Sequence, residues 1–248
     1  MSEWARMRIW GPAAVAVAAA FLWGLAVGFY HVFPYEPIRQ LKNLVEGDRK
    51  PAERPMVTNP AAETVALGDR DLPAVAADVV MAGDSITAGG RWGELFPGMS
   101  ILNRGVGGDM VTGLAKRTDE ILAHRPRVVV VMIGVNDLLS GNTARQILPV
   151  YGSLLAKLRA GGAQVIVQPV LCGTRCSDEQ RVELAATNRA LPALAARHGA
   201  RFLDLRPDFD DAKGVVRGEL TWDGLHFTGA GYRAWQRRLA PAIAEALR

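Results

Sequence analysis

Short apolar runs recur along the second part of the chain and predict the strands of a sheet. Three runs are strong and span Asp78–Ala82, Arg127–Ile133 and Ala163–Gln168. Two weaker runs span Met99–Leu102 and Arg201–Leu205. Continuous apolar runs of this length are typical of strands that are buried on both faces, as in a parallel sheet.

Helical patterns lie between these runs. Apolar residues at helical spacing predict one helix through Met110–Leu122 and another through Ile147–Leu158, and Ser177 with Gln180 has capping-box spacing before an Ala-rich stretch. That stretch contains Pro192, which we expect to bend or split the helix. Thr228 is placed to cap a last helix. The alternation predicts a three-layer α/β/α sandwich with a central parallel sheet over residues 76–248, with the ligand site beyond the carboxyl ends of its strands.

Composition and charge narrow the class of protein. The chain is 49% hydrophobic and 22% charged, which excludes a disordered polymer. Its formal net charge is +4, spread along the chain without a block of Lys or Arg. This pattern argues against a nucleic-acid partner.

Residues 9–30 form a run of 22 residues without a formal charge. A helix of this length is about 33 Å long, enough to cross the hydrocarbon core of a bilayer. We favour a retained N-terminal signal anchor, with a transmembrane segment in residues 1–30, over a cleaved signal peptide or a buried helix. Because long domains translocate largely regardless of charge, we expect the domain outside the cytoplasm, in the periplasm or its equivalent.

Residues 31–75 differ from the flanking segments. Six prolines interrupt any long periodic pattern in this stretch: Pro34, Pro37, Pro51, Pro55, Pro60 and Pro73. The sequence therefore predicts a stalk that separates the membrane segment from the domain.

Polar and glycine-rich motifs follow the predicted strands. Gly83-Asp84-Ser85 follows the first, where a tight turn exposes a serine hydroxyl and its backbone N–H at the rim of the sheet. A glycine-rich segment, residues 103–109, follows the second, and Asn136, whose side-chain amide is a hydrogen-bond donor, follows the third. Taken singly, these motifs are also compatible with a helix cap, a flexible turn and an Asx-turn.

Asp223 and His226 stand just before the predicted last helix. Their spacing lets a carboxylate reach Nδ1 of the imidazole, which leaves Nε2 to accept a proton from a hydroxyl. The other three histidines lie beside the membrane run or at the ends of Ala-rich helical patterns. His226 is therefore the candidate base, with a capped surface histidine as the alternative.

Together and in this order, the four motifs resemble those of the GDSL/SGNH hydrolases, whose fold is flavodoxin-like. The resemblance covers about residues 76–248. It implies that Ser85 is the nucleophile, His226 the general base and Asp223 its orienting partner. It also implies an oxyanion hole formed by the backbone N–H groups of Ser85 and Gly105 and by the Asn136 side chain. The resemblance implies no metal and no organic cofactor.

The substrate is less closely defined. The stretches Val131–Asp137 and Asp223–Thr228 resemble the branch with platelet-activating-factor-acetylhydrolase-like and carbohydrate-esterase-like members, which implies an ester of a small acyl group, such as acetyl, with a sugar or lipid alcohol. An O-acyltransferase with the same serine, and a non-catalytic membrane-tethered binding module, are the alternatives. Core packing is favoured over pocket lining for the apolar residues near the motifs, which are Trp92, Phe96, Met110, Leu138, Leu139, Trp222 and Phe227.

Cys172 and Cys176 bracket three residues in the loop after the third strong run. This loop is expected on the same rim as the site. Outside the cytosol a local disulfide that shapes the rim is favoured, with two free thiols as the alternative.

Overall fold

The computed structural model describes residues 55–68 and 74–248. The predicted membrane segment and most of the predicted stalk lie outside these residues. Within the described ranges, no helix has both the length and the apolar character needed to cross a bilayer.

The predicted parallel sheet is confirmed. Its strands are β1 (Val79–Gly83), β2 (Ile101–Gly105), β3 (Val128–Met132), β4 (Gln164–Val167) and β5 (Arg201–Phe202). They are all parallel and pair in the order β2-β1-β3-β4-β5. The residues of β1 and β3 are buried throughout, as their apolar runs predict.

Strand β2 is displaced from its prediction. The apolar run placed it at Met99–Leu102, but it runs from Ile101 to Gly105 and pairs in register with β1. This edge strand is only half-buried and ends with polar residues, so hydrophobicity alone marks its beginning and not its end.

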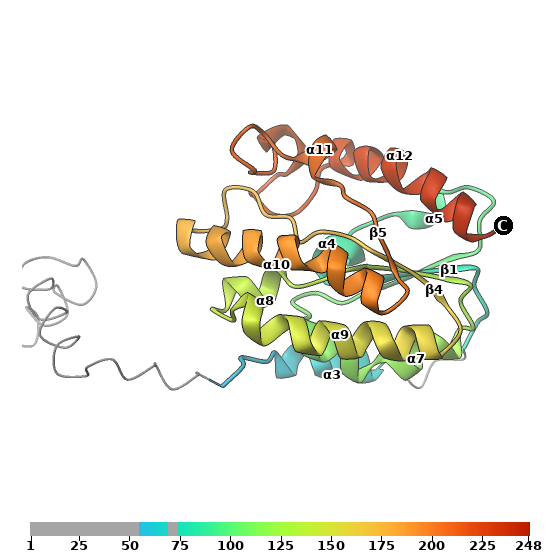
Figure 1. Cartoon of the computed structure of the whole chain (residues 1–248). Coiled ribbons are helices and arrows are strands. Elements are labelled where there is room, and N and C mark those ends of the chain that lie inside the picture. Colours follow the sequence, from blue (N-terminus) through green and yellow to red (C-terminus); the bar gives the residue numbers. More distant parts are fainter. Residues whose placement is uncertain (1–54, 69–73) are drawn as a thin grey trace, which may run out of the picture. The chain divides into compact units, whose positions relative to one another are not determined.

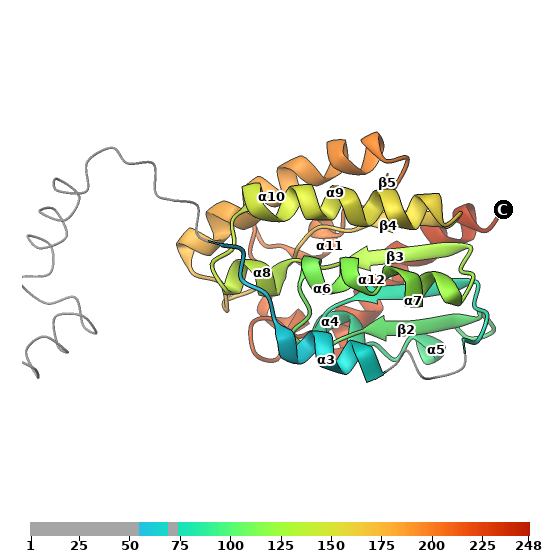
Figure 2. The same ribbon diagram turned by 90° about the horizontal axis from the view of Figure 1, so that it is seen from below.

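Helices cover the sheet on two sides (Figures 1 and 2). On one side lie α6 and α7 with α9, and on the other lie α5 and α12; α10 packs against α9 and β5. The bounds of these and the remaining helices are α4 (Ser85–Ala88), α5 (Trp92–Leu95), α6 (Val111–Lys116), α7 (Thr118–Ala123), α8 (Val135–Leu139), α9 (Ala144–Ala160), α10 (Asp178–Arg197), α11 (Arg206–Phe209), the 3₁₀ helix η2 (Gly218–Leu220) and α12 (Gly229–Ala246).

The predicted helices are present with two differences. The helix expected through Met110–Leu122 is divided into α6 and α7 at Arg117, whose side chain turns into the core. Helix α10 has the predicted capping box and continues through Pro192 without splitting. Thr228 caps α12, as predicted, by accepting a hydrogen bond from the Gly231 N–H.

The domain begins earlier than predicted. The compact unit spans Met56–Arg248, whereas the prolines indicated a stalk up to residue 75. Helix α3 (Pro60–Gly68) lies within that stretch, and Val57 exchanges backbone hydrogen bonds of 2.8 and 2.9 Å with the side chain of Asn142. The correction has a physical reason: Pro60 is at the first position of α3, where a proline starts a helix instead of breaking it.

The strand order fixes where a site can form. The chain passes from β1 to β2 on one side and then crosses to β3 on the other side of β1. Ligands of open α/β sheets bind at such a switch point, beyond the carboxyl ends of the strands. Ser85 follows β1 and Asn136 follows β3, so both predicted residues stand at this point.

Candidate active site

Ser85 is the first residue of α4, directly after β1. The preceding residue, Asp84, caps the helix by accepting a hydrogen bond of 3.0 Å from the Ile86 N–H. The first N–H groups of a helix have no partner within that helix. Within the described residues the Ser85 N–H accordingly has no hydrogen-bond partner. It stands next to the hydroxyl of its own side chain, which is only partly buried.

The structure brings His226 to Ser85 across 141 positions of sequence. The Ser85 Oγ lies 2.9 Å from Nε2 of His226, and Nδ1 lies 2.7 Å from Oδ2 of Asp223. A carboxylate only accepts hydrogen bonds, so the Nδ1 proton points at Asp223. Nε2 then accepts from the Ser85 hydroxyl, which is the arrangement that a general base requires.

Asp223 is held in its orientation by its own turn. Its Oδ1 accepts hydrogen bonds from the backbone N–H groups of Leu225, at 3.0 Å, and His226, at 2.8 Å. Partial burial raises the pKa of Asp223, but the hydrogen bonds from His226 and Leu225 outweigh it and hold the pKa below its usual value. The carboxylate therefore stays ionised opposite the imidazole.

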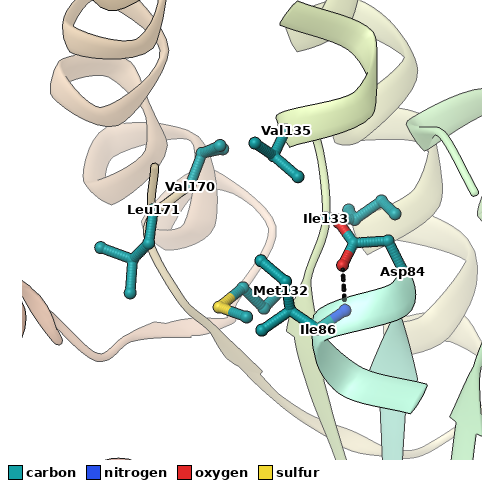
Figure 3. A pocket seen from close by; sticks show the side chains of 7 residues that line it. All are labelled: Asp84, Ile86, Met132, Ile133, Val135, Val170 and Leu171. Atoms are coloured by element: carbon teal, nitrogen blue, oxygen red, sulfur yellow. Dashed lines mark hydrogen bonds between the residues drawn. The ribbon is translucent and has the colours of Figure 1, made fainter. Parts of the chain in front are cut away.

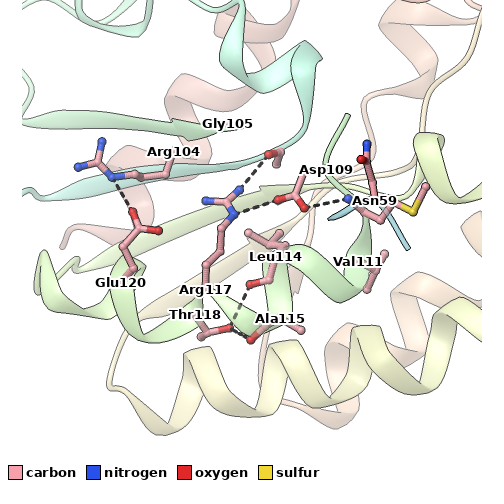
Figure 4. A network of polar contacts seen from close by, with 12 residues as sticks. Asn59, Arg104, Gly105, Asp109, Val111, Leu114, Ala115, Arg117, Thr118 and Glu120 are labelled. Carbon is pink, nitrogen blue, oxygen red and sulfur yellow. Dashed lines mark hydrogen bonds and ion pairs between the residues drawn. The ribbon is translucent and has the colours of Figure 1, made fainter. Parts of the chain in front are cut away.

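Asn136 reaches the same rim from α8. One of its amide protons is donated to the backbone carbonyl of Asp109 at 2.9 Å, which leaves the other for a ligand. Asp109 is itself fixed by a buried ion pair with Arg117, whose Nη2 also donates to the carbonyl of Gly83 at 3.1 Å (Figure 4). Arg117 thus links the end of β1 to the loop that orients Asn136, and its place in a helical pattern gave no sign of this.

Gly105 does not offer the donor expected of it. Its N–H already donates to the side chain of Asn103 at 2.9 Å. The residue belongs to β2, and a Cβ there would come within 2.1 Å of the Ala88 backbone nitrogen. Gly105 is needed for the close approach of β2 and α4, which explains a glycine here without an oxyanion role.

Gly108 offers an N–H that the sequence analysis did not consider. It has φ of +74° in the turn after β2, and its N–H has no partner among the residues that the structure describes. The turn is joined to β1 by the Val106 N–H, which donates to the Gly83 carbonyl, and it precedes Asp109, to which Asn136 is bound. No signal in the sequence separates Gly108 from Gly105, because both are glycines of one motif and only the structure shows φ.

Cys172 and Cys176 form a disulfide, with their Cα atoms 6.1 Å apart. The bridged turn lies against Gly224, the residue after Asp223: a Cβ on Gly173 would come within 2.5 Å of the Gly224 carbonyl oxygen. The disulfide loop therefore lies on the rim beside Asp223.

A small gap lies between buried side chains near the ends of the strands (Figure 3). Its lining includes the side chains of Asp84 and Ile86, the residues before and after Ser85 in the chain. The rest of the lining is apolar and comes from the ends of β3 and β4, namely Met132, Ile133, Val135, Val170 and Leu171. Of the apolar residues that the sequence placed near the motifs, all except Trp222 belong to the core or pack against it.

Within residues 55–68 and 74–248, no three His, Cys, Asp or Glu side chains are grouped so that they could hold a metal ion. The absence of a cofactor stays a prediction of the sequence.

Comparison with known proteins places the fold and the motifs in one family. A model of the GDSL-like lipase/acylhydrolase family matches residues 81–234. This chain belongs to that family. Platelet-activating factor acetylhydrolase IB subunit alpha1 from Bos taurus is 31% identical over 164 residues, which cover 62% of this chain and 70% of the relative. The alpha2 subunit from Rattus norvegicus is 29% identical over 209 residues, 75% of this chain and 87% of the relative.

Solved structures of other proteins have a fold similar to that of this hydrolase. A GDSL-like lipase from Bacteroides thetaiotaomicron has a TM-score of 0.64 at 21% identity and covers 75% of this chain and 98% of its own. An acetyl-xylooligosaccharide esterase from Geobacillus has a TM-score of 0.58 at 20% identity, covering 69% and 96%. The family and its curated relatives identify this GDSL hydrolase as a carboxylic ester hydrolase.

Three buried carboxylates lie beneath the rim of this GDSL hydrolase: Asp84, Asp109 and Asp137. Burial is the main cause that raises the pKa of Asp84 to about 7; the Ile86 N–H opposes it, and the charges of Asp109 and Asp137 add to it. Burial likewise raises the pKa of Asp137 to about 6, against hydrogen bonds from Val111 and Asn142. Asp84 and Asp137 therefore hold protons in the folded state at pH values where the unfolded chain has lost them.

The raised pKa of Asp84 predicts a pH-dependent stability. Its contribution to the free energy of unfolding falls as the pH rises from about 4 to about 7, by at most about 4 kcal/mol, and is constant above that range. Asp84→Asn keeps the oxygen that accepts from Ile86 and removes the charge. We expect the free energy of unfolding of this variant, relative to that of the wild type, to be higher at pH 8 than at pH 5. Urea unfolding of both proteins at the two pH values measures this difference.

Asp211→Asn is the matched control. Hydrogen bonds from Val215 and Lys213 lower the pKa of this exposed carboxyl, so it is ionised at both pH values. Its effect on stability should therefore be the same at pH 5 and pH 8. If Asp84→Asn also changed the free energy of unfolding by the same amount at pH 5 and pH 8, the raised pKa of Asp84 would be contradicted.

Proposed function

We propose that this hydrolase cleaves short-chain acyl esters through a covalent intermediate on Ser85, with His226 as general base and Asp223 as its orienting partner. The observation that carries the proposal is the continuous hydrogen-bonded chain from the Ser85 hydroxyl through both imidazole nitrogens to the Asp223 carboxylate, at 2.9 and 2.7 Å. We assign the oxyanion donors to the Ser85 N–H, the free amide proton of Asn136 and the Gly108 N–H, in place of Gly105.

Each group has one step to perform. His226 takes the Ser85 proton as Oγ attacks the ester carbonyl carbon, and the oxyanion donors stabilise the charge that forms on the carbonyl oxygen. His226 then gives this proton to the departing alcohol oxygen, and the acyl group stays on Oγ. Water, deprotonated by His226, attacks the acyl-enzyme, and the carboxylic acid leaves as Oγ recovers its proton.

The proteins that this chain resembles support a small acyl group. They include a platelet-activating factor acetylhydrolase subunit and an acetyl-xylooligosaccharide esterase.

Residues 9–30 support a membrane anchor that holds the domain outside the cytoplasm. The disulfide between Cys172 and Cys176 supports the same placement, because structural disulfides persist in oxidising compartments.

A covalent label and an ester series test this function. We expect diisopropyl fluorophosphate to modify Ser85, located by peptide mass spectrometry, with activity lost in proportion to labelling. Among ethyl esters from acetate to octanoate, kcat/KM should be highest for acetate and at least about tenfold lower for octanoate. Label on another residue, or a preference for octanoate, would overturn the proposal. Transfer of acetyl to an added methyl glycoside in place of water would instead identify an acyltransferase.

A further inference from the structure

Trp222 is a large apolar side chain left in solvent beside the catalytic histidine. It is 71% exposed, the highest value among the exposed large hydrophobic residues of the described part of the chain. Its ring is stacked on the His226 imidazole, with the ring centroids 5.5 Å apart and the planes at 18°. One face of the indole is thus covered by the imidazole, and the opposite face is open.

The backbone of Trp222 is held beside that of His226. The Trp222 N–H donates to the His226 carbonyl at 3.1 Å, and Thr221 and Phe227 form an antiparallel bridge that closes the loop 221–227. Within the loop, the Asp223 carboxylate accepts two hydrogen bonds from His226, one from the backbone N–H of His226 and one from its Nδ1. The loop therefore presents the indole and the imidazole together, stacked on one another, as a binding surface.

The position of the ring identifies the part of the substrate that it meets. In the proposed reaction, Nε2 of His226 gives its proton to the departing alcohol oxygen, so the alcohol leaves beside the imidazole. The Trp222 ring is stacked on that imidazole. Trp222 is therefore placed to border the alcohol portion of the ester.

The disulfide turn that packs against the loop 221–227 at Gly224 carries polar residues. Thr174 and Arg175, both exposed, lie against Gly224: a Cβ there would meet Thr174 Oγ1 at 2.3 Å, and the Arg175 N–H donates to the Gly224 carbonyl. No other exposed large apolar side chain comes from the loop 221–227 or from the disulfide turn 172–176 in the described chain. A lipid tail would need a contiguous apolar surface, which these two loops lack.

We infer that Trp222 is a stacking platform for the sugar ring of an acylated saccharide, which makes it the residue that selects the alcohol. A pyranose ring has an apolar C–H face that matches the open indole face, and hydroxyl groups that suit the polar residues of the neighbouring disulfide turn. This inference rests on the proposed ester hydrolysis at Ser85 and adds the substrate class to it.

Substrates that share the acetyl group and differ in the alcohol test the inference. Hydrolysis by the full-length chain is followed in a pH-stat with ethyl acetate, a monoacetylated methyl xyloside and a 2-acetyl alkyl glycerol ether. We expect Trp222→Ala to lower kcat/KM for the xyloside about tenfold, mainly through KM, because one stacking contact is lost. The rate with ethyl acetate should change less than about threefold, and Trp222→Phe should recover most of the xyloside activity. Val182→Ala, an exposed apolar residue of α10, is the control and should leave all three substrates unchanged.

The other outcomes are distinct. An equal loss on ethyl acetate and the xyloside would show that the indole acts through His226, as a cation–π partner of the imidazolium, and would overturn the platform. A loss confined to the alkyl glycerol ester, or a wild type that does not hydrolyse the xyloside, would also overturn it. A wild type inactive on all three acetates, ethyl acetate included, would refute the proposed hydrolysis itself.

Discussion

Ser85→Ala is expected to lower kcat for ethyl acetate by about 10⁴- to 10⁶-fold. The substitution removes the only atom that attacks the carbonyl, and His226 is left without a proton to take. The N–H of residue 85, Asn136 and Gly108 still stand at the rim, so some stabilisation of the oxyanion persists. We therefore expect a residual rate above that of water alone, and KM close to that of the wild type.

The structure also provides the control for this variant. The Ser85 hydroxyl is partly exposed and contacts His226, so its loss should leave the unfolding midpoint nearly unchanged. Ser153→Ala removes another hydroxyl, one that bonds the Pro149 carbonyl on the exposed side of α9, and should retain full activity. If Ser85→Ala kept more than about 1% of the wild-type kcat, the nucleophile would have to be another group.

The sequence predicted most accurately those strands in which every residue is buried. Strands β1 and β3 are buried on both faces, so their apolar runs match the strands to within two residues at either end. Strand β2 is half-buried at the edge, and hydrophobicity misplaced its end. The prolines led to a predicted domain start that was too late, because a proline breaks a helix only when it lies in the helix interior. Pro60 is the first residue of α3, a helix that belongs to the domain.

The residues of the candidate site also divide into those that the sequence could predict and those that it could not. That Ser85, Asp223 and His226 meet was predictable, because Ser85 follows a buried strand and Asp223 lies three residues before His226 at the start of the last helix. Their catalytic roles stay predictions. Glycine carries no such signature: Gly105 serves close packing and Gly108 presents a free N–H, although they stand in the same motif. Trp222 was expected in the core from its hydrophobicity, and only the folded loop 221–227 shows it stacked on the imidazole and open to solvent.

Asp223→Asn is expected to lower kcat by about 10³- to 10⁴-fold while the loop keeps its shape. The Asn oxygen retains the hydrogen bonds from the N–H groups of Leu225 and His226, which now bind Oδ1. The new NH₂ group then takes the place of Oδ2 and faces Nδ1 of His226. It can only donate, so Nδ1 becomes an acceptor and the ring proton moves to Nε2. In that tautomer Nε2 donates to Ser85 Oγ and cannot remove its proton.

The comparison with Asp223→Ala separates orientation of the base from support of the loop. Alanine loses the bonds to Leu225 and His226 as well as the bond to Nδ1, so we expect the unfolding midpoint to fall for alanine and to change little for asparagine. The loss in Asp223→Asn should lie in kcat and not in KM, because the wrong tautomer affects proton transfer and leaves ester binding intact. Near-normal kcat in the asparagine variant would mean that the tautomer of His226 is set by something other than Asp223. The hydrogen-bonded chain on which the proposed mechanism rests would then not be the route of the proton.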